Sequence, residues 1–277
     1  MKNIKLITAL LMGSFSIISC EDVVDIKLDT AAPKLVIDAA IKWQKETDGS
    51  NQKIKLTTTT DYYSATIPAA TGATVTVTNT SLSTPLTFQF IENAQTGEYI
   101  CNNFKPIVNN NYTLNIVYRG QSYAATSILT STPEIVKKEQ ILKPGFGGAD
   151  FYEVKFYFQD KATENNFYLV SAKNSTLVIP EYGVLDDKFT QGNLMFAVYQ
   201  AELKKGDIID YTVQGIPEKY GNYMSKLISI AGSTSGAPFA TAPATLRGNI
   251  INTNNVKNFP FGYFHLSEID SGSHTIE

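Results

Sequence analysis

The sequence predicts an all-β protein of two β-sandwich-like modules, with one short amphipathic helix in the second module. Segments rich in Val, Ile, Thr, Tyr and Phe recur along the chain, and many alternate between apolar and polar side chains, as half-buried strands do. Gly, Asn and Pro separate these segments, which is typical of turns. A single stretch in the second half repeats its apolar residues at three- and four-residue steps, the spacing of a helix.

The first twenty residues carry the most specific signal. Two lysines precede an apolar stretch over residues 6–18, the arrangement of an export signal peptide. The stretch is shorter than the about 20 apolar residues that a membrane-spanning helix needs. It ends in Ile17-Ile18-Ser19-Cys20, which resembles the lipobox of bacterial lipoproteins. We therefore predict a lipoprotein signal peptide over residues 1–19, with covalent diacylglycerol and N-acyl lipid on Cys20 as a membrane anchor. The alternative is an ordinary secretory signal beside a chance cysteine.

Composition limits what the mature chain can do. Removing residues 1–19 leaves 258 residues and moves the formal net charge from −3 to −5, because Lys2 and Lys5 are lost. A mildly acidic chain without a basic patch argues against a nucleic-acid partner. Cys101 is the only other cysteine, so we expect no disulfide framework. Its alternating context favours a half-buried strand residue over a reactive thiol.

Residues 20–33 are predicted to be an acidic, lipidated tether. Glu21, Asp22 and Asp25 follow the cysteine closely, and Pro33 closes the segment. Two interpretations remain open. The segment is either a solvated linker or a surface-export signal, since an acidic cluster after the cysteine resembles the signal of Bacteroidota lipoproteins.

The first module is predicted over residues 34–132 as a β-sandwich. Residues 97–126 resemble the last strands of prealbumin-like sandwiches found beside outer-membrane receptors, which implies an immunoglobulin-like or prealbumin-like fold. The expected strands lie at residues 35–37, 54–56, 75–77, 86–90, 112–118 and 122–126.

The second module is predicted over residues 133–277 as a larger β-rich domain that begins with a connector at 134–150. A helix should begin near Pro217, which suits a first turn, and end at Gly232. Its apolar face is most simply a core face, and a groove for a partner is the alternative. Strands are expected at residues 152–158, 167–171, 176–179, 194–201, 207–213, 246–251 and 263–269.

Several stretches in the second half carry a family resemblance. They are VKFYFQDKATENNFYLV (154–170), LDDKFTQGNLMFAVYQ (185–200), APFATAPATLRGNI (237–250) and FPFGYFHLSEI (259–269). Together with the lipobox and the opening KLVIDAAI (34–41), they resemble the Bacteroidota domain-of-unknown-function lipoproteins encoded beside TonB-dependent receptors. The resemblance implies an outer-membrane location, two β-rich modules and association with a receptor. It supplies no catalytic residues.

Metal chemistry has little support. The two histidines, His265 and His274, lack zinc-site spacing, and we predict no metal site. His265 lies between two apolar residues of an expected strand, so we expect it to be exposed or hydrogen-bonded. The clusters at 160–166 and 186–187 offer oxygen ligands that calcium prefers. Such side chains are more often turn formers that bond their own backbone.

Catalytic motifs are also missing, and we predict no catalytic residue and no cofactor other than the lipid. The segment 232–236 places Thr where a nucleophile elbow has Ser. Trp43, Tyr62 and Tyr63 lie in expected loops and are candidate ligand-contact aromatics. We expect a non-enzymatic outer-membrane lipoprotein that acts as an accessory or ligand-binding partner of a TonB-dependent transporter. The alternatives are a surface adhesion or structural module, or a hydrolase.

Overall fold

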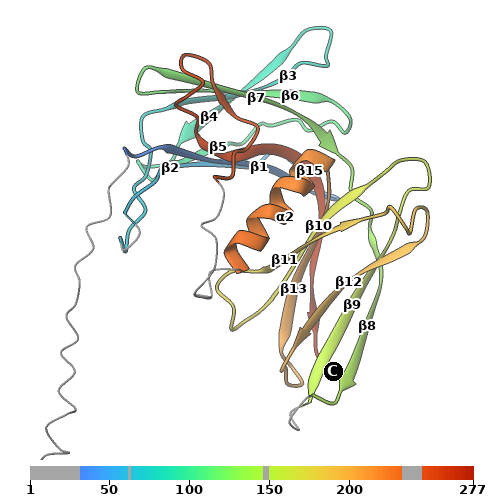
Figure 1. The fold of residues 1–277 in the computed structure, drawn as a ribbon. Coiled ribbons are helices and arrows are strands. Elements are labelled where there is room, and N and C mark those ends of the chain that lie inside the picture. The colour runs from blue at the N-terminus through green and yellow to red at the C-terminus, as the bar shows by residue number, and fades with distance from the viewer. Residues whose placement is uncertain (1–31, 62–63, 146–149, 233–244) are drawn as a thin grey trace, which may run out of the picture. The chain divides into compact units, whose positions relative to one another are not determined.

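Alternating apolar and polar residues form strands along most of the chain (Figure 1). The structure, a computed structural model, describes residues 32–61, 64–145, 150–232 and 245–277, and Pro33–Glu277 forms one unit. The strands are β1 (Leu35–Gln44), β2 (Gln52–Thr58), β3 (Thr74–Asn79), β4 (Leu86–Glu92), β5 (Glu98–Cys101), β6 (Asn111–Tyr118), β7 (Gln121–Thr130), β8 (Ile135–Lys143), β9 (Phe151–Gln159), β10 (Phe167–Asn174), β11 (Glu181–Asp186), β12 (Leu194–Ala201), β13 (Ile208–Ile216), β14 (Ile251–Asn252) and β15 (Phe261–Thr275), and the helix is α2 (Glu218–Gly232).

Eight of these strands close into a ring. The order is β15-β1-β2-β5-β4-β3-β6-β7, and β7 pairs back to β15 where Leu129 faces Leu266. Inward-facing residues of these strands fill the ring with a continuous apolar core, in which Phe104 lies against Phe88 and Tyr112. The strand alternation of the sequence therefore places one face of each strand inside the ring.

A second core lies between two further layers. The last part of β15 pairs with β13, which continues to β10 and β11, and β12-β9-β8 form a separate three-stranded sheet. Phe156 of β9 and Tyr211 of β13 meet with ring centroids 4.4 Å apart. Their contact joins the two layers face to face.

The mostly β composition and the helix predicted from the sequence are confirmed, but two distinct sandwich modules are not observed. A ring with additional strands replaces them, because the long strand β15 belongs to both parts. β14 also pairs with β7, across the boundary expected at residue 132. The sequence gives no local sign of this sharing, since the partners of β15 lie more than two hundred positions away in β1 and more than fifty away in β13.

Some local predictions are wrong. Residues 176–179 form a turn region, and β11 begins just afterwards at Glu181. The expected connector contains strand β8. Its central lysines and glutamate interrupt the alternation of apolar and polar residues that predicts a strand. Of the strand expected at 246–251, only Ile251 is in a strand.

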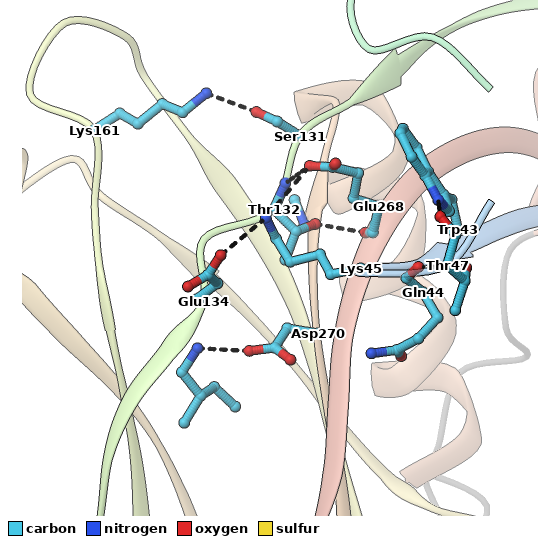
Figure 2. Close-up of polar contacts among 12 residues, drawn as sticks. Trp43, Gln44, Lys45, Thr47, Ser131, Thr132, Glu134, Lys161, Glu268 and Asp270 are labelled. Carbon is cyan, nitrogen blue, oxygen red and sulfur yellow. Dashed lines mark hydrogen bonds and ion pairs between the residues drawn. The ribbon is translucent and has the colours of Figure 1, made fainter. Parts of the chain in front are cut away.

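The chain leaves the ring at Ser131 and Thr132, where a polar junction fixes the second part (Figure 2). The Thr132 hydroxyl donates to the Glu268 carbonyl oxygen at 2.5 Å and accepts from the Gly215 N–H at 2.7 Å. The Thr132 N–H donates to the Glu268 carboxylate at 3.1 Å, and Lys45 lies 3.8 Å from the same carboxylate. One buried threonine thus ties the connector to both β13 and β15.

Candidate functional site: a tyrosine-lined pocket beside helix α2

The floor of the candidate site is the outer face of the parallel pair β1–β15. The inner faces of both strands fill the ring, with Phe264 and Leu266 fully buried. Side chains on the outer face can therefore be buried only by another element that packs against them. Register places Asp38 beside Tyr263, Ala40 beside His265, and Lys42 beside Ser267.

Helix α2 covers this floor (Figure 1). It begins where the Pro217 carbonyl accepts the N–H groups of Tyr220 and Gly221. Gly221 allows close approach to Phe167, since a Cβ there would lie 3.0 Å from the phenyl ring. The apolar spacing noted in the sequence turns one helix face toward β15 and β10. A pocket of about 420 Å³ remains between helix and floor, with Tyr182 of β11 at its side, within the size range of small-molecule sites.

Aromatic rings line much of this pocket. Tyr220 stacks on His265, with ring centroids 3.8 Å apart and an interplanar angle of 20°. The ring centroid of Tyr263 lies 4.8 Å from that of Tyr220 and 4.9 Å from that of Tyr223. These contacts hold the rings together and give the pocket a lining rich in aromatic side chains.

His265 is the exceptional group of the site. Its side chain is 1 % exposed, and neither ring nitrogen has a hydrogen-bond partner among the residues that the structure describes. Burial lowers the pKa of His265 to about 3, and the nearby Lys42 charge acts in the same direction, so the ring is neutral at pH 7. A buried polar group without a partner costs about 1–3 kcal/mol. The prediction that His265 is exposed or hydrogen-bonded is wrong.

Two charged residues border the imidazole. Asp38 and Lys42 are exposed, and within the described ranges neither side chain forms an ion pair, although Lys55 is the cross-strand neighbour of Asp38. Burial raises the pKa of Tyr220 and Tyr223, and the Asp38 carboxylate raises both further. The tyrosines therefore keep their protons at neutral pH, close to the Asp38 carboxylate.

The residues predicted as ligand contacts do not meet in this pocket. Cys20, Tyr62 and Tyr63 lie outside the described residues. Trp43 lies at the end of strand β1, so the prediction that it lies in a loop is wrong. It is half-buried, and its indole N–H donates to the Thr47 carbonyl oxygen at 2.8 Å (Figure 2). Its ring packs over Gly49, where a Cβ would come within 2.7 Å of the indole. A ligand role for these aromatics stays a prediction.

The acidic clusters considered for calcium are used within the fold. Asp160 is buried and accepts hydrogen bonds from the Tyr168 hydroxyl and from the Gly192 N–H. Asp187 accepts the N–H of Asn166 at 2.8 Å. Among the residues that the structure describes, no three His, Cys, Asp or Glu side chains are grouped as metal ligands.

Cys101 ends strand β5 and is buried. Burial raises the pKa of its thiol, which keeps the sulfur protonated and unreactive at neutral pH. The strand environment predicted from the sequence is confirmed, with deeper burial than expected.

The pocket could not be predicted from the sequence, because the residues that form its two halves are distant along the chain. Alternation around His265 indicates that Tyr263 and Ser267 share its face. Nothing local says that β15 pairs with β1 or that α2 covers them. The apolar face of the helix is the one local signal, and its spacing alone fits an ordinary core helix equally well.

Comparisons with known proteins give the family of the chain. No helix in the described part has the length and apolar character to span a bilayer. No curated protein matches the chain. Among solved structures, two fibronectin type-III domains of chicken tenascin are 11% identical over 66% of this chain and 90% of that one, with a TM-score of 0.21. The chicken CNTN1 FN1–FN3 domains are 12% identical over 69% of this chain and 63% of that one, with a TM-score of 0.25.

A family comparison covers nearly the whole chain. Residues 21–273 match the family described as a domain of unknown function, DUF4249. The match includes strands β1 to β7, β15 as far as residue 273, and both halves of the tyrosine-lined pocket. The chain therefore belongs to the DUF4249 family.

Proposed function

We propose that this chain is a lipid-anchored, non-enzymatic binding protein of the outer membrane. It captures a small molecule in the pocket beside α2 and acts as an accessory partner of a TonB-dependent transporter. The observation that carries the binding role is His265, which lines the pocket while both its nitrogens lack a partner in the described structure. Buried polar groups normally have one, and a ligand would supply it.

The charge states of the pocket favour binding over acid–base catalysis. An efficient general acid or base has a pKa near the working pH. The pKa of His265 is lowered to about 3 by burial, and burial raises that of Tyr220. Neither group exchanges a proton readily near pH 7, but both offer hydrogen bonds to a ligand.

The membrane anchor rests on the sequence. The lipobox-like ending at Cys20 gives the site of lipid attachment, and the family match begins at the next residue, 21. The folded unit begins at Pro33. Residues 21–32 can span at most about 40 Å when fully extended, which would keep the body close to the membrane surface.

Lipid attachment is tested by metabolic labelling with an alkyne fatty acid. We expect label on the wild-type chain and on Cys101→Ala, and none on Cys20→Ala, because only Cys20 would carry acyl chains. The wild-type chain should fractionate with the outer membrane. Label on Cys20→Ala equal to that of the wild type would contradict the anchor.

The transporter role is tested by crosslinking in intact cells followed by mass spectrometry. Recovery of a TonB-dependent receptor with the wild-type chain, and reduced nutrient uptake after deletion, would support the proposal. Loss of surface attachment with unchanged uptake would instead support the adhesion or structural alternative. Turnover of a compound by the purified chain would support the hydrolase alternative.

A further inference from the structure

We infer that the pocket beside α2 binds a small zwitterion of the short-peptide class. The inference rests on the binding role proposed above and names the ligand. The ammonium group lies at Asp38 among the tyrosine rings, the carboxylate lies at Lys42, and a peptide group lies between them at His265. Each position follows from the register of β1 and β15.

The cationic end is assigned by Asp38. Its carboxylate lines the pocket together with the rings of Tyr220, Tyr223 and Tyr263. A carboxylate forms charge-assisted hydrogen bonds with an ammonium group, and aromatic faces attract cations. Because Asp38 has no ion-pair partner in the described ranges, it is available to a ligand.

The anionic end is assigned by Lys42, which lies on the same face of β1 as Asp38. At about 3.3 Å per residue, their Cα atoms are about 13 Å apart. An extended peptide of two or three residues spans about 7–11 Å, and the flexible lysine stem closes the remaining distance. A mineral anion or a simple amine would engage only one of the two charges.

The centre of the ligand is assigned by His265, which faces Ala40, midway between Asp38 and Lys42. A neutral imidazole has one donor and one acceptor nitrogen, so a peptide C=O or a peptide N–H can pair with one of them. Tyr220 covers the imidazole face at 3.8 Å, so binding should displace the Tyr220 ring. Met224, Leu227 and Ile228 line the pocket as well and suit apolar ligand side chains.

The inference is tested by calorimetric titration of the full mature chain with three probes. These are leucyl-phenylalanine, its N-acetyl derivative and its C-terminal amide. We expect N-acetylation to weaken binding at least tenfold in the wild type. In Asp38→Asn the effect should be less than twofold, because this variant already lacks the carboxylate that pairs with the ammonium group. C-terminal amidation should likewise weaken binding at least tenfold in the wild type and less than twofold in Lys42→Met, which lacks the positive charge for the carboxylate. Lys226→Met, on the exposed side of α2, is the matched control and should bind as the wild type does.

The outcomes separate this inference from the proposed function. Absence of binding by leucyl-phenylalanine, or equal binding of all three probes by every variant, overturns the peptide assignment. If a receptor is still recovered by crosslinking in that case, the accessory role stands and only the ligand class fails. Circular dichroism confirms that each variant is folded before titration, so lost binding is not lost structure.

Discussion

At the residue scale, two buried polar groups of the second half, Asp160 and His265, differ in how they are satisfied. Asp160 receives a hydroxyl and an amide donor, whereas His265 receives none in the described structure. The expectation that Asp160 bonds the backbone of its own turn is wrong, because its partners Tyr168 and Gly192 lie 8 and 32 positions away. The state of His265 depends on α2 and β1, so no local pattern could reveal it.

Burial of neutral His265 should make the stability of the protein depend on pH. Its folded-state pKa of about 3 lies below the ordinary value of 6.5, so the unfolded chain takes up the proton first as pH falls. The free energy of unfolding is therefore unaffected by this group above pH 6.5 and decreases between pH 6.5 and about 3. The loss is about 1.4 kcal/mol per pH unit, or about 2 kcal/mol between pH 6.5 and 5.

Urea denaturation at pH 7.5, 6.5 and 5 measures this dependence. His265→Phe should keep the ring contact with Tyr220 and lose the slope that His265 causes. His274→Gln is the control, because His274 is only part-buried and is paired with Gln140, and it should keep most of the slope. Equal slopes in the wild type and His265→Phe would show that His265 ionises in the folded protein as it does in the unfolded chain.

At the element scale, helix α2 was the easiest feature to predict and β15 the hardest. The helix is predicted by local spacing and by Pro217 and Gly232, and the structure forms it over Glu218–Gly232. In β15 the expected strand at 263–269 is confirmed, but it extends from Phe261 to Thr275. Its pairing with β1 is parallel and joins opposite ends of the chain, which periodicity cannot indicate.

Gly262 should be essential to the β1–β15 pair. Its φ is +99°, and a Cβ there would lie 1.9 Å from the carbonyl oxygen of Ile37. Gly262→Ala adds a clash with backbone to left-handed strain, so we expect a loss of more than about 3 kcal/mol in the free energy of unfolding. Gly120→Ala is the control, since φ is +72° with nothing within 4 Å of the added Cβ, and strain alone should cost about 1 kcal/mol.

Chemical denaturation of both variants gives the comparison, and dipeptide titration adds a second measurement. Because Gly262 lines the pocket, its replacement should also impair ligand binding where the protein still folds. Equal destabilisation by the two substitutions would mean that β1 and β15 can separate at this point without penalty, contrary to the close approach described.

At the whole-molecule scale, the first and last strands of the folded unit complete the same ring. β1 pairs with β15, and β7 pairs with both β15 and β14. The predicted boundary at residue 132 follows the change in sequence pattern, but pairing crosses it. The same long strand then continues into the second part, so both parts depend on β15.

We therefore predict that residues 33–132 do not fold alone. Without β15, the ring loses Phe264 and Leu266 from its core, each contributing about 1.5–3 kcal/mol by burial, and β1 and β7 become open edges prone to association. Residues 33–277 should unfold in one cooperative transition with urea, whereas the fragment should show poor NMR dispersion and no sigmoidal transition. A dispersed spectrum and a cooperative transition for the fragment would establish it as an independent module, and β15 would then be an addition to a ring that closes without it.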